Sequence, residues 1–284
     1  MRRTFIVACL AAVAALSAHV AAQGPRMTAD RLAQLGAKPT PHLPNGRPDL
    51  NGTWDHLGGI EFVRPQTLAD GSVCVLDCGP APTFGPGGRA GGPPPGAAWT
   101  AFPKYKPALA AKVKDLSDRQ VETDSLLRCQ APGVPRLGPP QKIVQNAREL
   151  VLLYDDVNGP FFRIVPTDGR AHRRDLPSSY LGDAVGRWEG DTLVIETVNF
   201  NEETWLTDNG AFHTTDLKVI ERLRRAGDTI QYSAIANDLA VLAEPWTLRP
   251  QTLWVTDREL EEPARCEDRD LEHIVDGSHH DNPR

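Results

Sequence analysis

The sequence lacks the signatures of several function classes. It contains no G-x-x-x-x-G-K-[S/T] phosphate loop, no G-x-G-x-x-G dinucleotide fingerprint and no G-x-S-x-G nucleophile elbow. It also lacks an excess of basic residues, because 31 Lys and Arg stand against 37 Asp and Glu. Nucleic acids and anionic membrane surfaces are bound through positive fields, so neither is expected as a partner. Serine nucleophile chemistry and nucleotide cofactors have no sequence support, and no cofactor is expected.

Long hydrophobic runs are missing after the first 22 residues, so no membrane-spanning helix is expected. Residues 1–22 place Arg2 and Arg3 before an apolar run and end with small residues at Val20 and Ala22, which is the order of a secretory signal peptide. We expect cleavage after Ala22 and a periplasmic or secreted protein. The sequence does not indicate its oligomeric state.

Cysteines are few, and one of the five, Cys9, lies within the expected signal peptide. Four cysteines in an exported chain favour disulfide bonds, and three pairings are possible. We predict the pairs Cys74–Cys78 and Cys129–Cys266. No metal site is predicted at these thiols, because "CVLDC" has no second Cys or His pair at ligand spacing nearby.

The mature chain divides into regions of different composition. Residues 23–50 combine one short helical pattern with several prolines and are expected to form an N-terminal arm. A β-barrel domain is expected over residues 51–272, with a flexible Pro/Gly-rich insertion at 79–98. A short helix is expected near 107–116. The polar residues 273–284 are expected to form a disordered tail.

From Gln141 onward the pattern is that of β-strands. Short runs rich in Val, Ile, Leu, Thr, Phe and Tyr alternate with Gly, Asp, Asn and Pro, which predicts about seven to nine strands in all. "RWEGDTLVIE" and "RRAGDTIQYS" echo each other, with Gly190 and Gly227 in equivalent places, and indicate two antiparallel hairpins. Because apolar residues occur on both strand faces, both faces need cover. We therefore expect an all-β fold, a single antiparallel meander barrel.

The chain resembles a large family of mostly uncharacterised exported bacterial proteins that share a W-E-G-D-T-L-V hairpin. Gly52-Thr53-Trp54 is also similar to the opening of lipocalin-like (calycin-like) barrels. The family resemblance implies a β-rich exported protein and brings no activity. Asn199 stands where this pattern has glycine and Tyr180 where it has tryptophan, so no ligand preference is carried over. The matching blocks are "PDLNGTW" (48–54), "CQAPGVPR" (129–136), "TDGRAH" (167–172), "YLGDAVGRWEGDTLVIETVNFNEETWL" (180–206), "FHTTDLKVIER" (212–222), "EPWTL" (244–248) and "ARCED" (264–268).

Two histidines lie near the ends of predicted strands. Asp168, Arg170 and His172 follow one strand, and His213 precedes another. If they meet at one mouth of the barrel, an imidazole could transfer a proton while Asp168 fixes its tautomer. The other interpretation is a turn at Asp168 and histidines that pack locally. Metal binding by both histidines and a carboxylate stays open, because their separation gives no ligand spacing to test.

Two strands carry a carboxylate within an apolar run. The period of two places Glu221 on the apolar face of "LKVIERLRR", so we predict that it points inward. A buried carboxylate needs a partner, and Arg163 and His213 are the candidates. Glu196 is interpreted as lying on an outer face with Phe200, covered by the N-terminal arm, with its carboxylate reaching an arginine.

Three function hypotheses follow. The first is a barrel that binds a small, partly apolar organic molecule in a cavity lined by Trp188, Trp205 and Trp246. The second is a lyase, isomerase or hydrolase without a nucleotide cofactor. In it His172 or His213 transfers a proton, Glu221 is a further candidate acid, and Arg163 or Arg170 holds an anionic substrate group. The third is a structural envelope protein with a solid barrel.

Overall fold

The structure, a computed structural model, describes residues 27–56, 66–67, 73–74, 100, 102–156 and 158–261. The predicted signal peptide, the insertion at 79–98 and the tail at 273–284 lie outside the described residues. Cys78 and Cys266 lie outside them too, as does the side chain of Cys74. Cys129 is disulfide-bonded, and both predicted pairings stay predictions.

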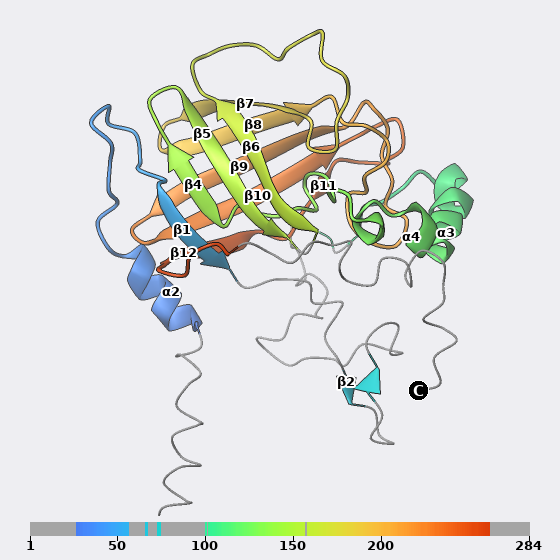
Figure 1. The fold of residues 1–284 in the computed structure, drawn as a ribbon, viewed down its shortest axis with the longest axis horizontal. Coiled ribbons are helices and arrows are strands. Elements are labelled where there is room, and N and C mark those ends of the chain that lie inside the picture. Colours follow the sequence, from blue (N-terminus) through green and yellow to red (C-terminus); the bar gives the residue numbers. More distant parts are fainter. Residues whose placement is uncertain are drawn as a thin grey trace, which may run out of the picture.

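Most of the regular secondary structure among the described residues is β-strand, in one antiparallel sheet (Figure 1). Short helices lie before and between the strands. A separate two-stranded sheet pairs β2 (Gln66–Thr67) with β3 (Val73–Cys74). The strands of the main sheet are β1 (Gly52–His56), β4 (Lys142–Gln145), β5 (Glu149–Asp156), β6 (Gly159–Pro166), β7 (Asp183–Glu189), β8 (Thr192–Val198), β9 (Lys218–Ala226), β10 (Thr229–Asn237), β11 (Trp246–Thr247) and β12 (Gln251–Thr256).

The main sheet curves into a nearly closed barrel, which confirms the predicted all-β barrel. Its strand order is β6-β5-β4-β1-β12-β10-β9-β8-β7, and β11 pairs with β10. The two end strands, β6 and β7, lie side by side without a hydrogen-bonded ladder between them. At this seam a Cβ on Gly186 would lie 2.9 Å from side-chain carbons of both Val165 and Thr167. The glycine therefore lets β6 pack directly against β7.

The two Gly-Asp-Thr echoes form two-residue hairpin turns, as predicted. β7 pairs with β8 around Gly190 and Asp191, and β9 pairs with β10 around Gly227 and Asp228. Gly190 and Gly227 have φ values of +58° and +56°, as the first central residue of a type II′ turn requires. Local turn chemistry thus fixes the register of both hairpins.

Helix α2 (Ala29–Gly36) lies against the end of the barrel where the β9–β10 turn is (Figure 1). Asp228 N donates to Leu35 O at 3.0 Å, and Gly227 N donates to Thr40 Oγ1 at 2.9 Å. Thr28 caps the helix by accepting a hydrogen bond from Arg31 N. This end of the barrel is therefore held by backbone contacts as well as by the buried Leu35 side chain.

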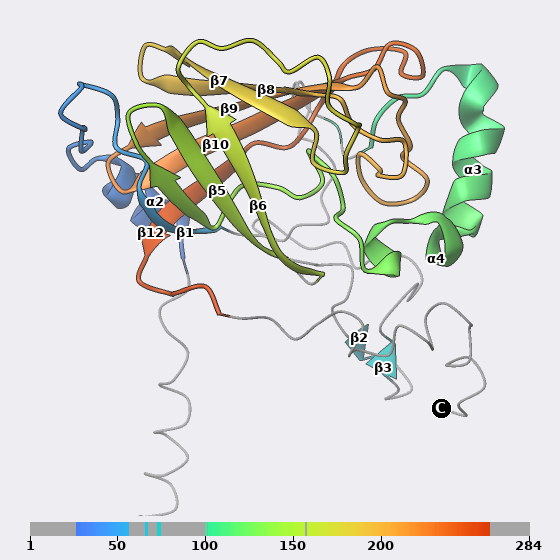
Figure 2. The same ribbon diagram turned by 45° about the horizontal axis from the view of Figure 1, so that its top comes forward.

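The predicted helix near 107–116 is present as η2 (Pro107–Leu109) followed by α3 (Ala110–Asp118). The short helices α4 (Gln120–Thr123) and η3 (Leu126–Arg128) come next. Figure 2 shows α3 and α4 beside the end of the barrel remote from α2. None of the helices among the described residues has the length and apolar character needed to cross a bilayer.

Buried apolar side chains form two groups. The barrel cluster fills the strand-lined interior, and the end cluster joins strand ends to the loops near α3. The barrel cluster is Leu50, Trp54, Leu137, Ile143, Leu150, Leu152, Tyr154, Val165, Ala184, Leu193, Ile195, Leu223, Ile230, Tyr232, Ala234 and Leu253. The end cluster is Val134, Phe200, Trp205, Leu206, Ala211, Phe212, Leu217, Val219, Ala236, Val241, Leu242 and Trp246.

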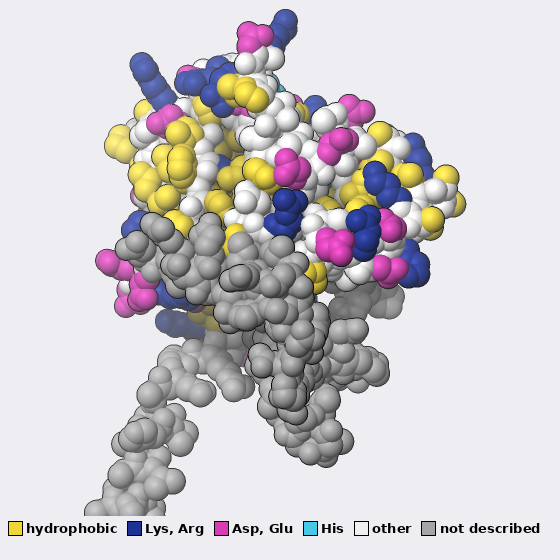
Figure 3. Space-filling view, turned by 45° about the vertical axis from the view of Figure 1, so that its right-hand side comes forward, with side chains coloured by type: hydrophobic (Ala, Val, Ile, Leu, Met, Phe, Trp, Pro, Cys, Tyr) yellow, Lys and Arg dark blue, Asp and Glu magenta, His cyan; other side chains and the backbone are white. Residues whose placement is uncertain are grey.

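The outer faces of β4 and β6 are left partly uncovered. Val144, Phe162 and Ile164 are 47%, 61% and 50% exposed. In Figure 3 hydrophobic side chains gather at the left of the view, whereas its right-hand side mixes charged side chains of both signs with hydrophobic ones. The sequence predicts that both faces of the strands are covered by other parts of the chain. Among the described residues this covering of the outer face is incomplete.

The equivalent glycines of the two hairpins should respond differently to Ala. Gly190→Ala should lower the free energy of unfolding by about 1–2 kcal/mol, the cost of the left-handed conformation, because a Cβ there meets nothing within 4 Å. Gly227→Ala should lower the free energy of unfolding by ~1–3 kcal/mol more than Gly190→Ala does. The added Cβ would lie 2.8 Å from Lys38 O and still closer to Leu35 O. Urea denaturation of both variants checks this, and equal losses would contradict the close packing of α2.

Candidate functional site

The side chains that point into the barrel form layers along its axis. On β9 the inward residues run from Val219 through Glu221 to Leu223. Val219 belongs to the end cluster and Leu223 to the barrel cluster, so Glu221 lies between the two apolar regions. Five strands contribute to a polar layer around it, formed by Tyr154, Arg163, Thr197, Glu221 and Tyr232.

An ion pair holds the polar layer together. Arg163 Nη2 lies 2.7 Å from Glu221 Oε2 and donates to Thr197 Oγ1, also at 2.7 Å. Arg163 Nη1 donates to Tyr154 Oη at 3.1 Å, and Tyr232 Oη donates to Glu221 Oε1 at 3.1 Å. Arg163 and Glu221 are 4% and 0% exposed. The predicted inward orientation of Glu221 is confirmed, and Arg163 is its partner rather than His213.

Burial fixes the protonation of this layer. It raises the pKa of Tyr154 to about 12, and burial together with the Glu221 charge raises the pKa of Tyr232 well above its ordinary value. Burial alone would lower the pKa of Arg163, but the Glu221 carboxylate outweighs it and raises that pKa. Both phenols therefore stay protonated and Arg163 stays a cation near neutral pH. The layer is a brace across the interior. The two terminal nitrogens of its guanidinium are engaged by protein partners, whereas the buried Nε has no hydrogen-bond partner among the described residues.

His213 is buried in the end cluster, 2% exposed, with its ring edge-on to Phe200. Nδ1 lies 2.9 Å from the Thr214 carbonyl oxygen, which can only accept, so Nδ1 carries the proton. Nε2 then accepts the hydroxyl proton of Thr204 at 2.7 Å. Burial lowers the pKa of His213. Both ring nitrogens are used within the core.

His172 finds a different carboxylate from the one the sequence indicates. Its Nδ1 lies 3.0 Å from Asp183 Oδ2, whereas Asp168 pairs with Arg170 on the exposed surface at 2.7 Å. The hydrogen bonds from Arg170 lower the pKa of Asp168 to about 2. Among the described residues no hydrogen bond or ion pair joins His172, His213 and Asp168. The convergence of these groups at one barrel mouth, which the acid–base hypothesis requires, is therefore not found.

Asp183 is the buried centre of this surface cluster, 4% exposed. Arg173 donates to it from Nε at 2.8 Å and from Nη2 at 2.7 Å. Burial would raise the pKa of Asp183, but the hydrogen bonds from Arg173 and His172 outweigh it and lower that pKa. The cluster attaches the segment around residue 172 to the start of β7.

Glu196 lies on the outer face of β8, as predicted, but its partners are not arginines. Its Oε1 is 3.4 Å from His172 Nε2 and 3.4 Å from Lys218 Nζ. The strand alternation also ends earlier than expected, because Asn199 is left-handed with φ +63° and Phe200 turns into the end cluster. The Glu196 carboxylate contacts His172, in the segment before β7. The prediction that Glu196 is covered by the N-terminal arm and reaches an arginine is therefore wrong.

The three tryptophans proposed as ligand contacts do not share a cavity. Trp188 packs against the barrel cluster, with the Arg47 guanidinium 5.7 Å from its ring centre. Trp205 and Trp246 belong to the end cluster, and Trp246 Nε1 donates to Thr100 O at 3.0 Å. All three rings are structural in this arrangement.

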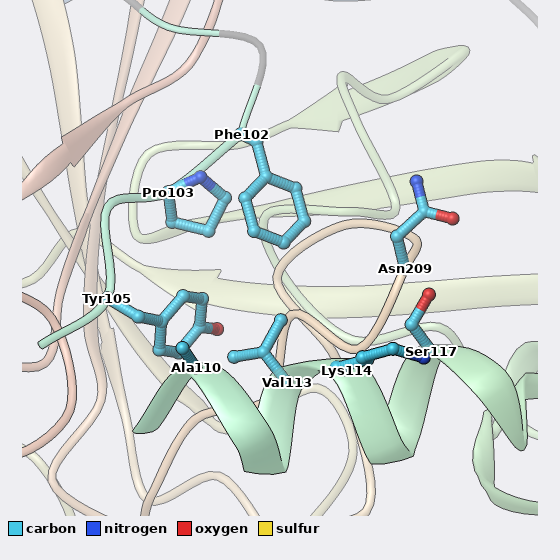
Figure 4. A pocket seen from close by; sticks show the side chains of 8 residues that line it. All are labelled: Phe102, Pro103, Tyr105, Ala110, Val113, Lys114, Ser117 and Asn209. Carbon is cyan, nitrogen blue, oxygen red and sulfur yellow. The ribbon is translucent and has the colours of Figure 1, made fainter. Parts of the chain in front are cut away.

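A surface groove with a volume of about 330 Å³ lies between α3 and the segment that precedes it (Figure 4). One helix face supplies four lining residues at i, i+3, i+4 and i+7, and the turn at Asn209 completes the rim. The lining residues are Phe102, Pro103, Tyr105, Ala110, Val113, Lys114, Ser117 and Asn209. The groove therefore draws on three segments that are separate in the sequence.

Close packing fixes the shape of this groove. Gly210 has φ +77°, and a Cβ on it would lie 2.9 Å from Ser117 N and closer still to Val113 O, so α3 rests directly on the 209–210 turn. The Tyr105 ring stacks on Phe212 with centroids 5.2 Å apart, and its hydroxyl donates to Phe212 O. Burial is the main cause that raises the pKa of Tyr105, and the negative charge of Asp238 raises it further.

The sequence interpretation missed Asp183 and the groove. Asp183 is eleven residues from His172, and only the path of the intervening loop brings them together. The groove had one sequence signal, the helical face that carries Ala110, Val113, Lys114 and Ser117, but its aromatic wall and Asn209 come from elsewhere. Among the described residues no group of three His, Cys, Asp or Glu side chains is placed to hold a metal ion.

Comparisons with protein-family models, curated proteins and solved structures found no significant match for this chain.

Removing one charge of the buried pair should be strongly destabilising. Glu221→Gln leaves the Arg163 charge without its counter-ion, so the free energy of unfolding should fall by about 3–5 kcal/mol. The double variant Arg163→Met with Glu221→Leu should recover much of this loss, because no buried charge remains. Glu189→Gln, which breaks the exposed pairs with Arg187 and Arg222, is the control and should change stability little. Equal losses for Glu221→Gln and Glu189→Gln in urea denaturation would contradict the brace.

His213 should make stability depend on pH below neutrality. Its folded pKa lies below the ordinary 6.5, so between the two values the unfolded chain binds a proton that the native protein does not. Stability should therefore fall as pH falls through this window. His213→Gln should lose this part of the slope when unfolding is measured from pH 7.5 to 5. An unchanged slope would show that the native and unfolded states bind this proton equally, and that burial does not lower the pKa of His213.

Proposed function

We propose that the protein is exported and binds a small, partly apolar organic molecule in the groove between α3 and residues 102–105. The observation that carries the proposal is the groove itself (Figure 4). Its volume of about 330 Å³ falls within the range of small-molecule sites, which are lined mainly by apolar and aromatic groups with a few polar ones. The barrel serves as the rigid support of this site.

Three features support a ligand site in the groove rather than among the tryptophans of the barrel. The barrel cluster occupies the interior with packed side chains. The polar layer uses Arg163 and Glu221 for each other and for hydroxyl partners. The groove, by contrast, has an aromatic wall and polar groups at one rim, on a helix fixed by the turn at Gly210.

Two observations support export. The first 22 residues have the composition of a signal peptide, and a disulfide bond at Cys129 is typical of an oxidising compartment. We further propose that the chain belongs to the family of exported proteins whose W-E-G-D-T-L-V hairpin it shares.

Acid–base catalysis has less support. Both nitrogens of His213 are hydrogen-bonded inside the end cluster. Nδ1 of His172 faces Asp183, and its Nε2 is buried 3.4 Å from Glu196. A general base must reach the proton that it abstracts, and neither ring presents a nitrogen to a substrate in this arrangement.

Filling the groove should abolish ligand retention. Val113→Trp places a large ring where the ligand would lie, so native mass spectrometry of the exported protein should show at least a tenfold lower bound fraction than wild type. Val144→Trp is the matched control, because Val144 lies on the exposed outer face of β4, and it should retain the ligand. The same masses should show a chain that begins at Gln23.

Retention of the same molecule by both variants would contradict the groove as its site. The proposed binding function is wrong if two results are obtained together. Wild type and the control retain no molecule, and no member of a small-molecule library binds them while failing to bind Val113→Trp. A structural role would then remain the better explanation of the packed barrel.

A further inference from the structure

We infer that the groove selects a small aromatic carboxylate, a deduction that rests on the proposed binding function. The groove has two chemically different ends. Phe102, Tyr105 and Val113 form one wall, and Lys114, Ser117 and Asn209 form the opposite rim (Figure 4). A ligand that satisfies both ends has an apolar body and one polar group.

The apolar end favours a flat ring. The Phe102 and Tyr105 rings are 6.1 Å apart and tilted by 45°, within the range of aromatic pairs. Tyr105 gives its hydroxyl proton to Phe212 O, so it offers the groove a ring and no free donor. One face of this ring is already stacked on Phe212. Two rings beside a branched aliphatic side chain bind a planar apolar body best.

The polar end favours a negative charge. Lys114 is the charged residue of the lining, and no carboxylate belongs to the lining. Among the described residues its ammonium pairs with Asp118 alone, and the two side chains are 74% and 60% exposed, so this pair is easily exchanged for a ligand. The Ser117 hydroxyl and the Asn209 amide have no hydrogen-bond partner among the described residues, and both can donate to an oxyanion.

The number of charges points to a carboxylate rather than a phosphate. The rim has one ammonium and two neutral donors, without the guanidinium fork that commonly binds phosphate. Ser117 lies in the last turn of α3, where the carbonyl ends of the helix disfavour negative charge, and a doubly charged phosphate more strongly than a singly charged carboxylate. A single negative charge on a one-ring body matches the groove in both charge and size.

The test uses cinnamate and its neutral isostere cinnamamide as probes in isothermal titration calorimetry. Wild type should bind cinnamate at least tenfold more tightly than cinnamamide, and added salt should reduce the difference. Lys114→Met should remove the preference for cinnamate. Lys112→Met is the matched control: this lysine lies on the same helix, but its ammonium sits 3.9 Å from the centre of the Phe212 ring and outside the lining. It should keep the preference.

The outcomes separate the ligand class from the binding function. Equal affinities for both probes in wild type, or a preference that survives Lys114→Met, would overturn the aromatic carboxylate. If neither probe binds but a different molecule is lost specifically from Val113→Trp, the class is wrong and the groove still binds. If no molecule distinguishes Val113→Trp from Val144→Trp, the binding function fails together with the class.

Discussion

The ion pair between Arg163 and Glu221 is the interaction on which the barrel's closure depends. β6 and β7 meet without a backbone ladder, and Arg163 spans this side of the barrel by reaching from β6 to Thr197 on β8 and Glu221 on β9. A buried ion pair is a poor source of net stability, but removing one partner is costly. The pair therefore acts mainly as a constraint on register. A shift of β6 by one residue would expose Arg163 and bury Phe162 and Ile164.

The polar layer also explains why the interior is divided. Apolar side chains pack on both sides of it, the barrel cluster toward α2 and the end cluster toward α3. Each cluster closes against elements outside the sheet, so the barrel has packed ends rather than an open mouth lined by tryptophans. The accessible chemistry lies at the periphery, where α3 and the turn at Gly210 meet. Helix α3, held against the turn at Gly210, positions its polar groups more firmly than a loop alone would.

Strand patterns predicted those features that depend on near neighbours in sequence. Alternation placed Glu221 inward, and Gly-Asp-Thr located both hairpin turns. Features that depend on a chain path were missed: Asp168 pairs with nearby Arg170, and Asp183 reaches His172 only across a loop. Glu196 was placed on the correct face, but its partners come from another segment and another strand. The groove could not be predicted because its three segments carry no shared spacing.

The pairing of β1 with β12 has a consequence for how the chain folds. Within β4–β6 and within β7–β10, each strand pairs with the next strand in the sequence. Each set can therefore assemble locally. β1 pairs with β4 on one side and β12 on the other, and its partners in β12 lie about 200 residues away. Contacts of such long range form late. The barrel therefore acquires its final shape only when the last strand reaches the first, after both halves of the chain have emerged.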